Sequence, residues 1–558
     1  MAHILRQQVE SGSIIYGVNT GYGGSADVRS NNVSELQRSL IRHLNAGFGT
    51  TLPAYLVKAV MAVRINSLSL GYSGIRPSTV DLLVSMFNHD IIPVVPKRGS
   101  VSASGDLMPT SYIAACMIGR SDARVLFDGV PMTAPEAFAD ARLKSVTFQG
   151  KEALAVINSA SFSSSLGAIV LYDANIAIVL TQVATALTSE ALCGSIESFH
   201  PTIHRCLPHP GQQEVASNIR HMLVESKFTR HAPVTSNDQA GVLKQDRYAL
   251  RSSPQWLGPV VETALESIRR VTTELNSAND NPLIDHEQDE ILHGANFQGT
   301  SVTVAMDQLR QSLQLCGKLL FGQMQELINH TMNDGLPPNL AGTDVNVDFG
   351  FKGMDTAMAS YMSELDYLSN NVTNHVLSTE LHNQAVNSMA LVSARYTQKV
   401  LDILQMMITN IFLAQLQAID LRLMKTKTEL ALSKLLADCD PQILEPVLKL
   451  IPWYQFVFCP RDSSQKVLQY FPVMEQSDKQ QLSSQIEDTM QEIRLEFQSG
   501  RHVADVERLL GQGNSRNFVE SVELYVVLYE VFSHSKLQCV LLLSADCKSH
   551  HYANATSG

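Results

Sequence analysis

Three small residues, Ala103, Ser104 and Gly105, lie in the segment RGSVSASGDLMPTSYIA at positions 98–114. None carries an imidazole or a carboxylate, and a serine hydroxyl without a neighbouring base is a poor nucleophile. Chemistry here would have to use the backbone. A glycine nitrogen can attack the carbonyl two residues earlier because its backbone is unhindered, and loss of two waters then gives an electrophilic methylidene-imidazolone whose methylene comes from Ser104. The alternative is a turn that caps a helix beginning near Asp106.

A candidate base, Tyr16, opens the glycine-rich segment YGVNTGYGG at positions 16–24. A tyrosinate can remove a weakly acidic carbon-bound proton, but its ordinary pKa of about 10 must be lowered for use near neutral pH. The glycines would let the segment close as a lid. A phosphate-binding loop is excluded, because no Gly-Lys-Ser/Thr sequence follows.

A candidate carboxylate-binding group is Arg251 in QDRYALRSSPQW, since a guanidinium grips a carboxylate through two parallel hydrogen bonds. Tyr248 precedes it by three positions, which places both on one face if the segment is helical. A surface role is the alternative for each of these side chains.

A polar stripe is predicted farther along the chain, where four residues have the spacing of one helix face within an apolar segment. The alternative is a solvated face. The four residues are Glu380, Asn383, Gln384 and Asn387.

The segment FHPTIHRCLPHP could suggest zinc ligands, because His200, His204, Cys206 and His209 lie close together. Pro201 interrupts the spacing, and the chain contains no His-Glu-x-x-His motif. We therefore expect a structural segment and no metal.

Composition narrows the possible partners. The 558-residue chain has a formal net charge of -12 and no long basic run, so nucleic acid is an unsuitable partner. Eight cysteines without a Cys-x-x-Cys pair predict reduced thiols. The N-terminus lacks the apolar core of a signal peptide, and Asp173, Asn175 and Gln182 interrupt the most apolar stretch. We expect a cytoplasmic protein without a membrane partner.

The elements that must position these residues are predicted to be mainly α-helical. Apolar residues recur at helical spacing from about residue 150 onward, and strand-like alternation is rare. Segment 300–332 predicts one long helix, and segment 352–424 predicts a second with one or two breaks. Helices of this length form a bundle. We expect a loop-rich N-terminal region over 1–155, a long-helix bundle over 156–424 and a C-terminal helical extension over 425–558.

Nine segments between Tyr16 and Met424, roughly three quarters of the chain, resemble the motifs of the aromatic amino acid ammonia-lyase family and follow them in order. This family includes histidine, phenylalanine and tyrosine ammonia-lyases and related aminomutases. The segments are YGVNTGYGG, GSVSASGDLMPTSYIA, KEALAVINSA, SFHPTIHRCLPHPGQ, KQDRYALRSSPQWLGP, NSANDNPLID, HGANFQGT, FGFKG and TELHNQAVNS.

The resemblance implies that the tripeptide becomes a methylidene-imidazolone (MIO), which removes the amino group of an aromatic amino acid and leaves an α,β-unsaturated acid. No metal or dissociable cofactor is implied. Tyr16 would be the catalytic base, and Arg251 would bind the substrate carboxylate. The other implied roles are Tyr248 and Asn158 beside the electrophile, Gln245 near it, Asn281 on the carboxylate and Phe297 against the ring.

The predicted polar stripe would line the same pocket. The resemblance implies that Glu380 is the partner of the amine or the electrophile, with Asn383 and Gln384 as pocket residues. Lys352 in FGFKG and Gln384 match the phenylalanine and tyrosine branch, because histidine ammonia-lyases carry other residue types at these places.

Two residues in LIRHLNAG, His43 and Leu44, match the positions that contact the substrate ring. A histidine can hydrogen-bond a phenolic hydroxyl, so His43 favours tyrosine, while a water would allow phenylalanine. A core histidine is the alternative. The chain departs from the family at Tyr22, where phenylalanine is commoner, and at Ser159 and Ala160, where Gly-Thr is usual.

The expected reaction gives cinnamate or p-coumarate plus ammonia. The alternatives are an aromatic amino acid 2,3-aminomutase and a catalytically impaired member kept as a structural partner. The resemblance implies a homotetramer in which each active site draws residues from three chains. Only fifteen residues precede Tyr16, and the end VLLLSADCKSHHYANATSG matches no family motif, so we expect a truncated or misread sequence.

Overall fold

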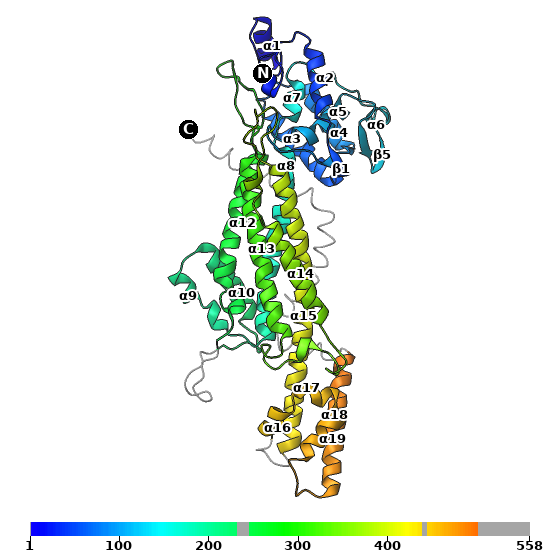
Figure 1. Cartoon of the computed structure of the whole chain (residues 1–558), viewed down its shortest axis with the longest axis vertical. Coiled ribbons are helices and arrows are strands. Elements are labelled where there is room, and N and C mark those ends of the chain that lie inside the picture. Colours follow the sequence, from blue (N-terminus) through cyan, green and yellow to red (C-terminus); the bar gives the residue numbers. More distant parts are fainter. Residues whose placement is uncertain (1, 232–244, 438–443, 500–558) are drawn as a thin grey trace.

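The computed structural model describes residues 2–231, 245–437 and 444–499. Figure 1 shows an elongated molecule in which a loop-rich N-terminal part, a bundle of long helices and a smaller helical part follow one another along the long axis. The prediction of a mainly α-helical protein built on long helices is confirmed.

The N-terminal part combines short helices with two small antiparallel sheets. Strand β1 pairs with β3, and β4 lies between β2 and β5, with Ile92 opposite Leu126. The elements are α1 (Ala2–Glu10), η1 (Gly23–Ser25), α2 (Val33–Leu44), β1 (Phe48–Thr51), α3 (Ala54–Ser69), α4 (Pro77–Asn88), β2 (Ile91–Pro93), β3 (Pro96–Arg98), α5 (Leu107–Met117), β4 (Arg124–Phe127), β5 (Val130–Thr133), α6 (Ala134–Asp140) and α7 (Glu152–Ile157).

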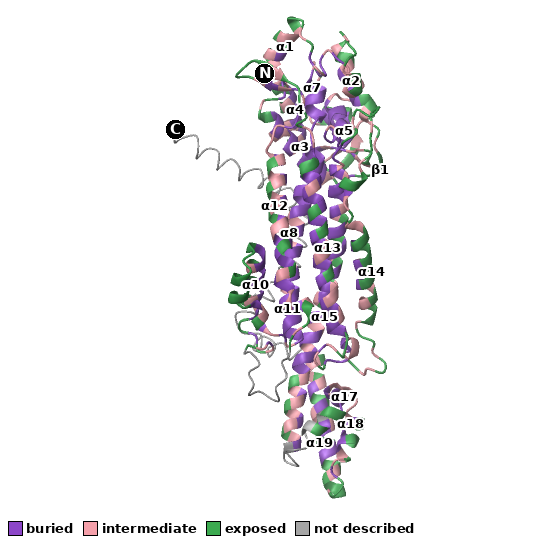
Figure 2. Ribbon diagram, turned by 60° about the vertical axis from the view of Figure 1, so that its left-hand side comes forward, coloured by how far each residue is buried: buried purple, intermediate pink, exposed green. Residues whose placement is uncertain are grey.

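The bundle consists of α8 (Ser161–Ala191), α12 (Ser253–Leu275), α13 (Thr300–Ile328) and α15 (Ala390–Ala437). Figure 2 shows buried residues running along the inner faces of these helices. Buried amides also join them, because Gln415 of α15 donates to the Ala184 carbonyl and the Thr188 hydroxyl of α8, each at 2.7 Å. Such bonds satisfy polar groups that would be costly to bury alone.

Helix α14 (Lys352–Leu368) runs antiparallel to α13. Gln325 of α13 bonds to Asp355, near the beginning of α14, and Gln314 donates to Asp366, near its end, at 2.6 Å. The segment 352–424 is thus divided into α14 and α15. The remaining elements beside the bundle are η2 (Ile196–Phe199), α9 (Pro201–Cys206), α10 (Pro210–Leu223), α11 (Tyr248–Arg251), β6 (Leu283–Asp285), β7 (Glu290–Leu292), η3 (Pro338–Leu340) and η4 (Val372–His375).

The polar stripe predicted from Glu380 to Asn387 is not on a helix, and this prediction was wrong. Residues 376–389 form a loop with an isolated antiparallel bridge between Thr379 and Gln384. Glu380 and the two residues after it have φ values of 51°, 54° and 67°, in the left-handed region that cannot continue a right-handed helix. Helical spacing alone did not reveal this turn.

The C-terminal part packs on the end of α15. Trp453 donates from its indole nitrogen to the Gly335 carbonyl at 2.7 Å, and Phe456, Ile486 and Met490 are buried. Its helices are α16 (Leu444–Leu450), α17 (Trp453–Phe458), α18 (Pro460–Leu468) and α19 (Gln476–Gln498). The rest of the predicted extension, 500–558, lies outside the described residues, and the predicted boundaries at 155 and 424 stay predictions.

Two apolar helical stretches, Glu152–Ala191 and Ala390–Leu436, are long enough to cross a membrane by length and composition. Within their most apolar windows, 61% and 50% of the residues are buried inside the bundle. Core helices of a bundle pass the same test, so this is weak support for a span. The predicted cytoplasmic location stays a prediction.

Candidate active site

A cavity of about 530 Å³ lies in the N-terminal part and collects most of the predicted site residues. Its walls come from the tyrosine segment, α2, the tripeptide segment, the end of α7 and the loop before α15. The predicted residues that line it are Tyr16, His43, Leu44, Ala103, Ser104, Gly105, Asn158, Asn281, Phe297, Glu380, Asn383 and Gln384.

The Ser104 side chain points to the cavity and does not cap a helix. The N-cap of α5 is Asp106, and it makes no side-chain capping hydrogen bond. The Ser104 hydroxyl instead accepts from the Gln384 amide at 3.2 Å, while its carbonyl accepts from the Asn158 amide at 2.7 Å. These contacts disfavour the simple capping turn.

Glycine is required at position 105. Gly105 has φ +69°, and a Cβ built there would lie 2.4 Å from the Ser159 backbone. An isolated bridge joins Ala103 to Gly105, so the two ends of the tripeptide approach each other. The oxygen of the Asn158 side chain is also buried without a hydrogen-bond partner among the described residues. The turn formed by residues 103–105 is tight and has no side chain at Gly105, and the neighbouring Asn158 has a buried oxygen without a partner among the described residues. Both features fit the MIO group.

The buried carboxylate of Asp106, which the sequence analysis did not single out, anchors the segment that carries the tripeptide. Asp106 accepts from the Ser102 hydroxyl at 2.6 Å and from the Ser163 amide at 2.7 Å. Burial raises its pKa, and these hydrogen bonds lower it in part. Ser388 donates to the Ser102 carbonyl at 2.7 Å, which links this segment to the loop before α15. The signal in the sequence that could have identified Asp106 is a charged residue directly before an apolar helix.

Tyr16 lines the same cavity as the tripeptide, and its hydroxyl accepts from the Gly23 amide at 2.8 Å. Burial raises the pKa of Tyr16, the Gly23 hydrogen bond lowers it, and the negative charge of Glu380 raises it again. The net direction within one chain is upward, which is opposite to the lowering that a base near neutral pH requires.

Glu380 reaches the tyrosine segment. Its carboxylate accepts from the Gly24 amide at 3.1 Å and from the Asn383 amide at 3.0 Å. A Cβ built on Gly23 would lie 1.6 Å from a Glu380 oxygen, so the Glu380 side chain would have to move, and the φ of +55° at Gly23 also favours glycine. The loop 376–389 therefore packs directly on the tyrosine segment 16–24.

His43 and Leu44 line the cavity from the end of α2. The His43 Nδ1 lies 2.9 Å from the Ser39 carbonyl oxygen, which can only accept. The proton is thereby assigned to Nδ1, and Nε2 is left as an acceptor. Across the cavity, the Asn281 side-chain oxygen accepts from the Gly294 amide at 2.8 Å.

Four predicted site residues, Gln245, Tyr248, Arg251 and Lys352, are absent from this cavity. The first three form a cluster of their own, because Gln245 accepts from Arg251 and the guanidinium of Arg251 lies 5.0 Å from the centre of the Tyr248 ring.

This cluster lies at the other end of α13. The Ala249 carbonyl accepts from Gln323 at 3.0 Å, whereas Gly299, just before α13, approaches the Ser388 hydroxyl beside the tripeptide segment. Gln323 lies 23 positions after Thr300 in this helix, which corresponds to about 35 Å at 1.5 Å per residue. A chain therefore cannot bring Arg251 into its own cavity.

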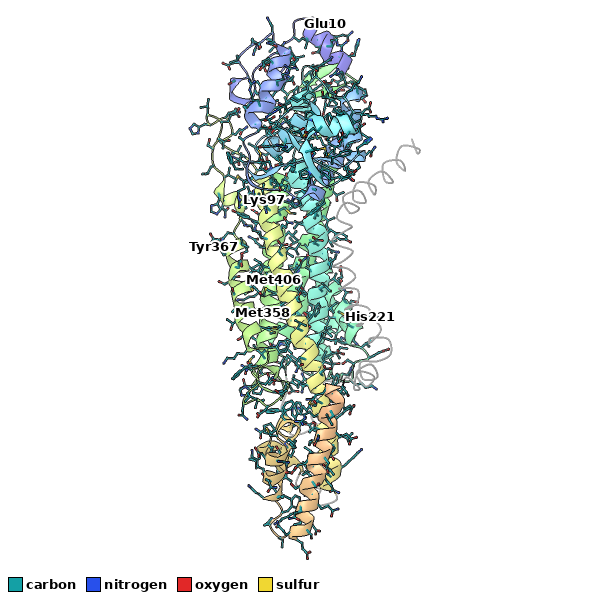
Figure 3. The ribbon with its side chains drawn as sticks, turned by 90° about the vertical axis from the view of Figure 1, so that its right-hand side faces the viewer. Glu10, Lys97, His221, Met358, Tyr367 and Met406 are labelled. Carbon is teal, nitrogen blue, oxygen red and sulfur yellow. The ribbon has the colours of Figure 1, made fainter. Side chains whose placement is uncertain are left out.

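Lys352 is also remote, because Asp355 in the same helix turn pairs with Gln325 near the end of α13. Figure 3 shows the separation, with Lys97 of the tripeptide end far above Met358 of α14. Neither lysine nor arginine occurs among the described residues that line the cavity. Among the described residues of one chain, the cavity lining therefore offers no lysine or arginine to a substrate carboxylate.

Two of the three histidines of the possible zinc segment, His200 and His204, have protein partners. His200 accepts from the Thr202 amide at 3.2 Å at the start of α9, and buried His204 bonds to the Ser198 carbonyl and to Gln212, each at 3.0 Å. Among the described residues, no group of three or more metal-ligating side chains converges.

The sequence analysis also missed Gln37, a buried amide that contacts the tyrosine segment. It shares the buried face of α2 with Leu40 and Ile41. A polar residue at this spacing on an apolar helix face was the signal that could have found it.

Two relatives show how similar this chain is to known proteins in sequence. A phenylalanine aminomutase of Taxus canadensis is 44% identical over 484 residues, which cover 83% of this chain and 69% of that protein. A phenylalanine ammonia-lyase of Aspergillus hancockii is 44% identical over 439 residues, covering 75% and 62%. The chain thus spans less than two thirds of the length of the latter protein.

Solved structures of other proteins share the fold of this chain. A phenylalanine ammonia-lyase from Rhodosporidium toruloides superposes with a TM-score of 0.81 at 30% identity, covering 98% of this chain and 91% of that chain. A tyrosine aminomutase from Streptomyces globisporus gives 0.70 at 29% identity, covering 90% and 91%. The family model for aromatic amino acid lyases matches residues 1–440. This match extends over the cavity, the bundle and the remote arginine cluster alike, and the chain belongs to the aromatic amino acid lyase family.

Proposed function

We propose that the protein removes the amino group of L-phenylalanine or L-tyrosine as ammonia and leaves trans-cinnamate or p-coumarate. The observation that carries this proposal is the placement of Ser104 and Tyr16 in one cavity, with Asn158 bonded to the Ser104 carbonyl. The family membership and the fungal phenylalanine ammonia-lyase relative support it.

The residues around the tripeptide suit the MIO group, which when formed supplies an electrophilic methylene carbon. Asn158 would hold the carbonyl of residue 104, and Gln384 would donate to the departing hydroxyl. Asp106 anchors the segment from behind through Ser102. These groups are already in place before a substrate arrives, which lowers the cost of orienting the reacting atoms.

Tyr16 is proposed to take the β-proton of the substrate. Its phenolate would be stabilised by the Gly23 amide, which already donates to its hydroxyl. The substrate carboxylate calls for a cationic partner, and a positive charge nearby would also lower the pKa of Tyr16. Since none of the described residues that line the cavity is a lysine or an arginine, we propose that the cation comes from another copy of the chain.

A homotetramer with shared sites would supply this cation. Arg251, with Tyr248 and Gln245 beside it, would enter the cavity of a neighbouring chain. Apolar side chains that another copy could cover are exposed both beside the cavity and at the far end of the bundle. They are Leu377, Leu381 and Val386 beside the cavity, and Val347, Phe349 and Tyr248 at the remote end.

The acceptor nitrogen of His43 gives the site a partner for a phenolic hydroxyl, which supports acceptance of tyrosine. Incubation of the purified protein with tyrosine, phenylalanine and histidine, followed by identification of the products, tests the proposal. Coumarate or cinnamate with an equal amount of ammonia is the expected result. Urocanate from histidine as the main product would overturn it.

A second candidate is a 2,3-aminomutase, which would return the ammonia to the β-carbon. The 44% identity to the Taxus phenylalanine aminomutase favours it. The same incubation separates the two, because the mutase gives a β-amino acid and releases little ammonia. A folded protein that gives no product from any of the three amino acids would instead support the catalytically impaired member.

A further inference from the structure

We infer that Gln37 is a positioning residue that holds the lid segment so that the Gly23 amide points at Tyr16. The inference rests on the proposed role of Tyr16 as the base. Gln37 is 1% exposed, and its side chain uses both ends of its amide. Its nitrogen donates to the Gly17 carbonyl at 3.3 Å and to the Tyr22 hydroxyl at 3.0 Å, and its oxygen accepts from the Ala153 amide at 3.1 Å.

The two contacts of the nitrogen hold both ends of one turn. Gly17 directly follows Tyr16, and Tyr22 directly precedes Gly23, whose amide donates to the Tyr16 hydroxyl at 2.8 Å. The rings of Tyr16 and Tyr22 meet edge to face, with centres 6.4 Å apart. One buried amide therefore fixes the base and the donor that contacts it.

The oxygen of Gln37 connects this turn to the electrophile side of the cavity. Ala153 lies in the first turn of α7, where backbone amides lack partners within the helix. The same helix ends at Asn158, which donates to the Ser104 carbonyl. The lid and the tripeptide are thus attached to opposite ends of α7, and Gln37 makes the first of these attachments.

One of the three contacts of Gln37 depends on the side chain of Tyr22. The Tyr22 hydroxyl exists only because this sequence departs from the phenylalanine commoner in the family. In the structure, this hydroxyl accepts a hydrogen bond from the Gln37 side chain.

Loss of the Gln37 contacts should change the ionisation of Tyr16. The Gly23 amide lowers the pKa of Tyr16, while burial and Glu380 raise it. If the turn relaxes, the Gly23 amide leaves and the pKa of Tyr16 rises further. Because the base must be deprotonated, the acidic limb of the pH profile of kcat should move to higher pH. KM should change less, because Gln37 does not line the cavity.

The experiment compares Gln37→Leu, Tyr22→Phe and a matched control, Gln415→Leu. Gln415 is also fully buried and also donates twice, but it lies 25 residues beyond Ala390 in α15, about 38 Å along the helix. We expect kcat of Gln37→Leu at neutral pH to fall about 10-fold or more, with its acidic limb displaced upward by about one pH unit. Tyr22→Phe removes one of the three bonds and should show a smaller displacement in the same direction. The profile of Gln415→Leu should coincide with that of the wild type.

A second readout does not depend on turnover. Ultraviolet difference titration against Tyr16→Phe, in the wild-type and the Gln37→Leu backgrounds, reports the ionisation of Tyr16 itself. A higher midpoint in the Gln37→Leu background supports the inference. Equal midpoints, or a pH profile of folded Gln37→Leu that matches the control, would overturn it.

If Gln37→Leu does not fold, Tyr22→Phe carries the test, because it leaves the amide and its other two contacts in place. An acidic limb and a titration midpoint unchanged by Tyr22→Phe would then overturn the inference. Failure of the proposed function is a separate outcome, since the wild type itself would give neither an unsaturated acid nor a β-amino acid.

Discussion

The Gln384 side chain donates a hydrogen bond to the Ser104 hydroxyl at 3.2 Å, although 280 positions separate the two residues. The donor comes from the loop before α15, and the acceptor lies just before α5. This contact joins the part of the chain that supplies the proposed electrophile to the loop that packs on the lid.

Ser104→Ala should leave the fold intact and remove nearly all turnover, a loss of at least about 1000-fold, because only Ser104 can supply the methylene carbon. The control is Ser165→Ala, since the buried Ser165 hydroxyl has no hydrogen-bond partner among the described residues. Turnover and the ultraviolet absorbance before and after borohydride would be measured for both variants. Near wild-type turnover in Ser104→Ala would remove the electrophile from the mechanism.

Mixing inactive Tyr16→Phe and Arg251→Ala chains under conditions of subunit exchange should restore part of the activity. The reason is that Tyr16 lines the cavity and Arg251 lies at the remote end of the same chain. Some cavities of a mixed oligomer would then receive intact copies of both. Activity would be followed as the two variants exchange.

The structure also supplies a control for this mixing experiment. Tyr16 and Ser104 line the cavity of one chain, so mixing Tyr16→Phe with Ser104→Ala should give no recovery. If proven exchange restores neither pair, or both pairs equally, the sites are not shared in the proposed way.

His43→Phe should lower kcat/KM for tyrosine relative to phenylalanine by about 10-fold, the scale of one hydrogen bond. The change removes the Nε2 acceptor and fills its space with an apolar ring, and both effects favour phenylalanine. The ratio of the two specificity constants is the measurement. An unchanged ratio would show that His43 does not contribute to the choice between the two rings. An equal loss of kcat/KM for both substrates would indicate a damaged site.

Glu380→Gln should move the acidic limb of kcat to lower pH. The negative charge of Glu380 raises the pKa of Tyr16, so its removal lowers that pKa and the base is deprotonated at lower pH. The amide oxygen of glutamine can still accept from Gly24. Glu35→Gln, an exposed residue paired with Arg42, serves as the control and should leave the limb in place. If the acidic limb of the kcat profile of Glu380→Gln stays at the same pH or moves to higher pH, the electrostatic account is contradicted.

Glu190→Gln should stabilise the protein above neutral pH. Burial raises the pKa of Glu190 to about 7, and a hydrogen bond from Ser226 offsets this only in part. The pKa of Glu190 is higher in the folded than in the unfolded state. The contribution of protonated Glu190 to stability is therefore complete below about pH 4.5 and is lost as the pH rises through about 7.

The neutral amide does not titrate, so the variant should exceed the wild type in unfolding free energy by up to about 3 kcal/mol at pH 8. Thermal unfolding of both proteins at pH 5 and pH 8 checks the sign. A difference that does not grow between about pH 5 and pH 8 would show that Glu190 is not the titrating group.

The helical bundle could be predicted from the sequence because its signal is local. Apolar residues at helical spacing between Thr300 and Ile328 have few breaking residues among them, and the structure has one helix there. Ser104 and Tyr16 could be singled out for the same reason, since the small tripeptide and the glycine-rich lid are short, contiguous patterns. Their predicted roles stay predictions.

The tertiary structure alone decided how the pocket is assembled. Glu380 and Gln384 have helical spacing, yet three successive left-handed residues place them on a loop, and a period of three and four residues cannot distinguish the two. The separation of Arg251 from Ser104 depends on the length and direction of α13, which brings Ala249 beside Gln323 about 35 Å from the tripeptide end. Contacts between residues hundreds of positions apart depend on how helices pack, and local patterns do not contain that information.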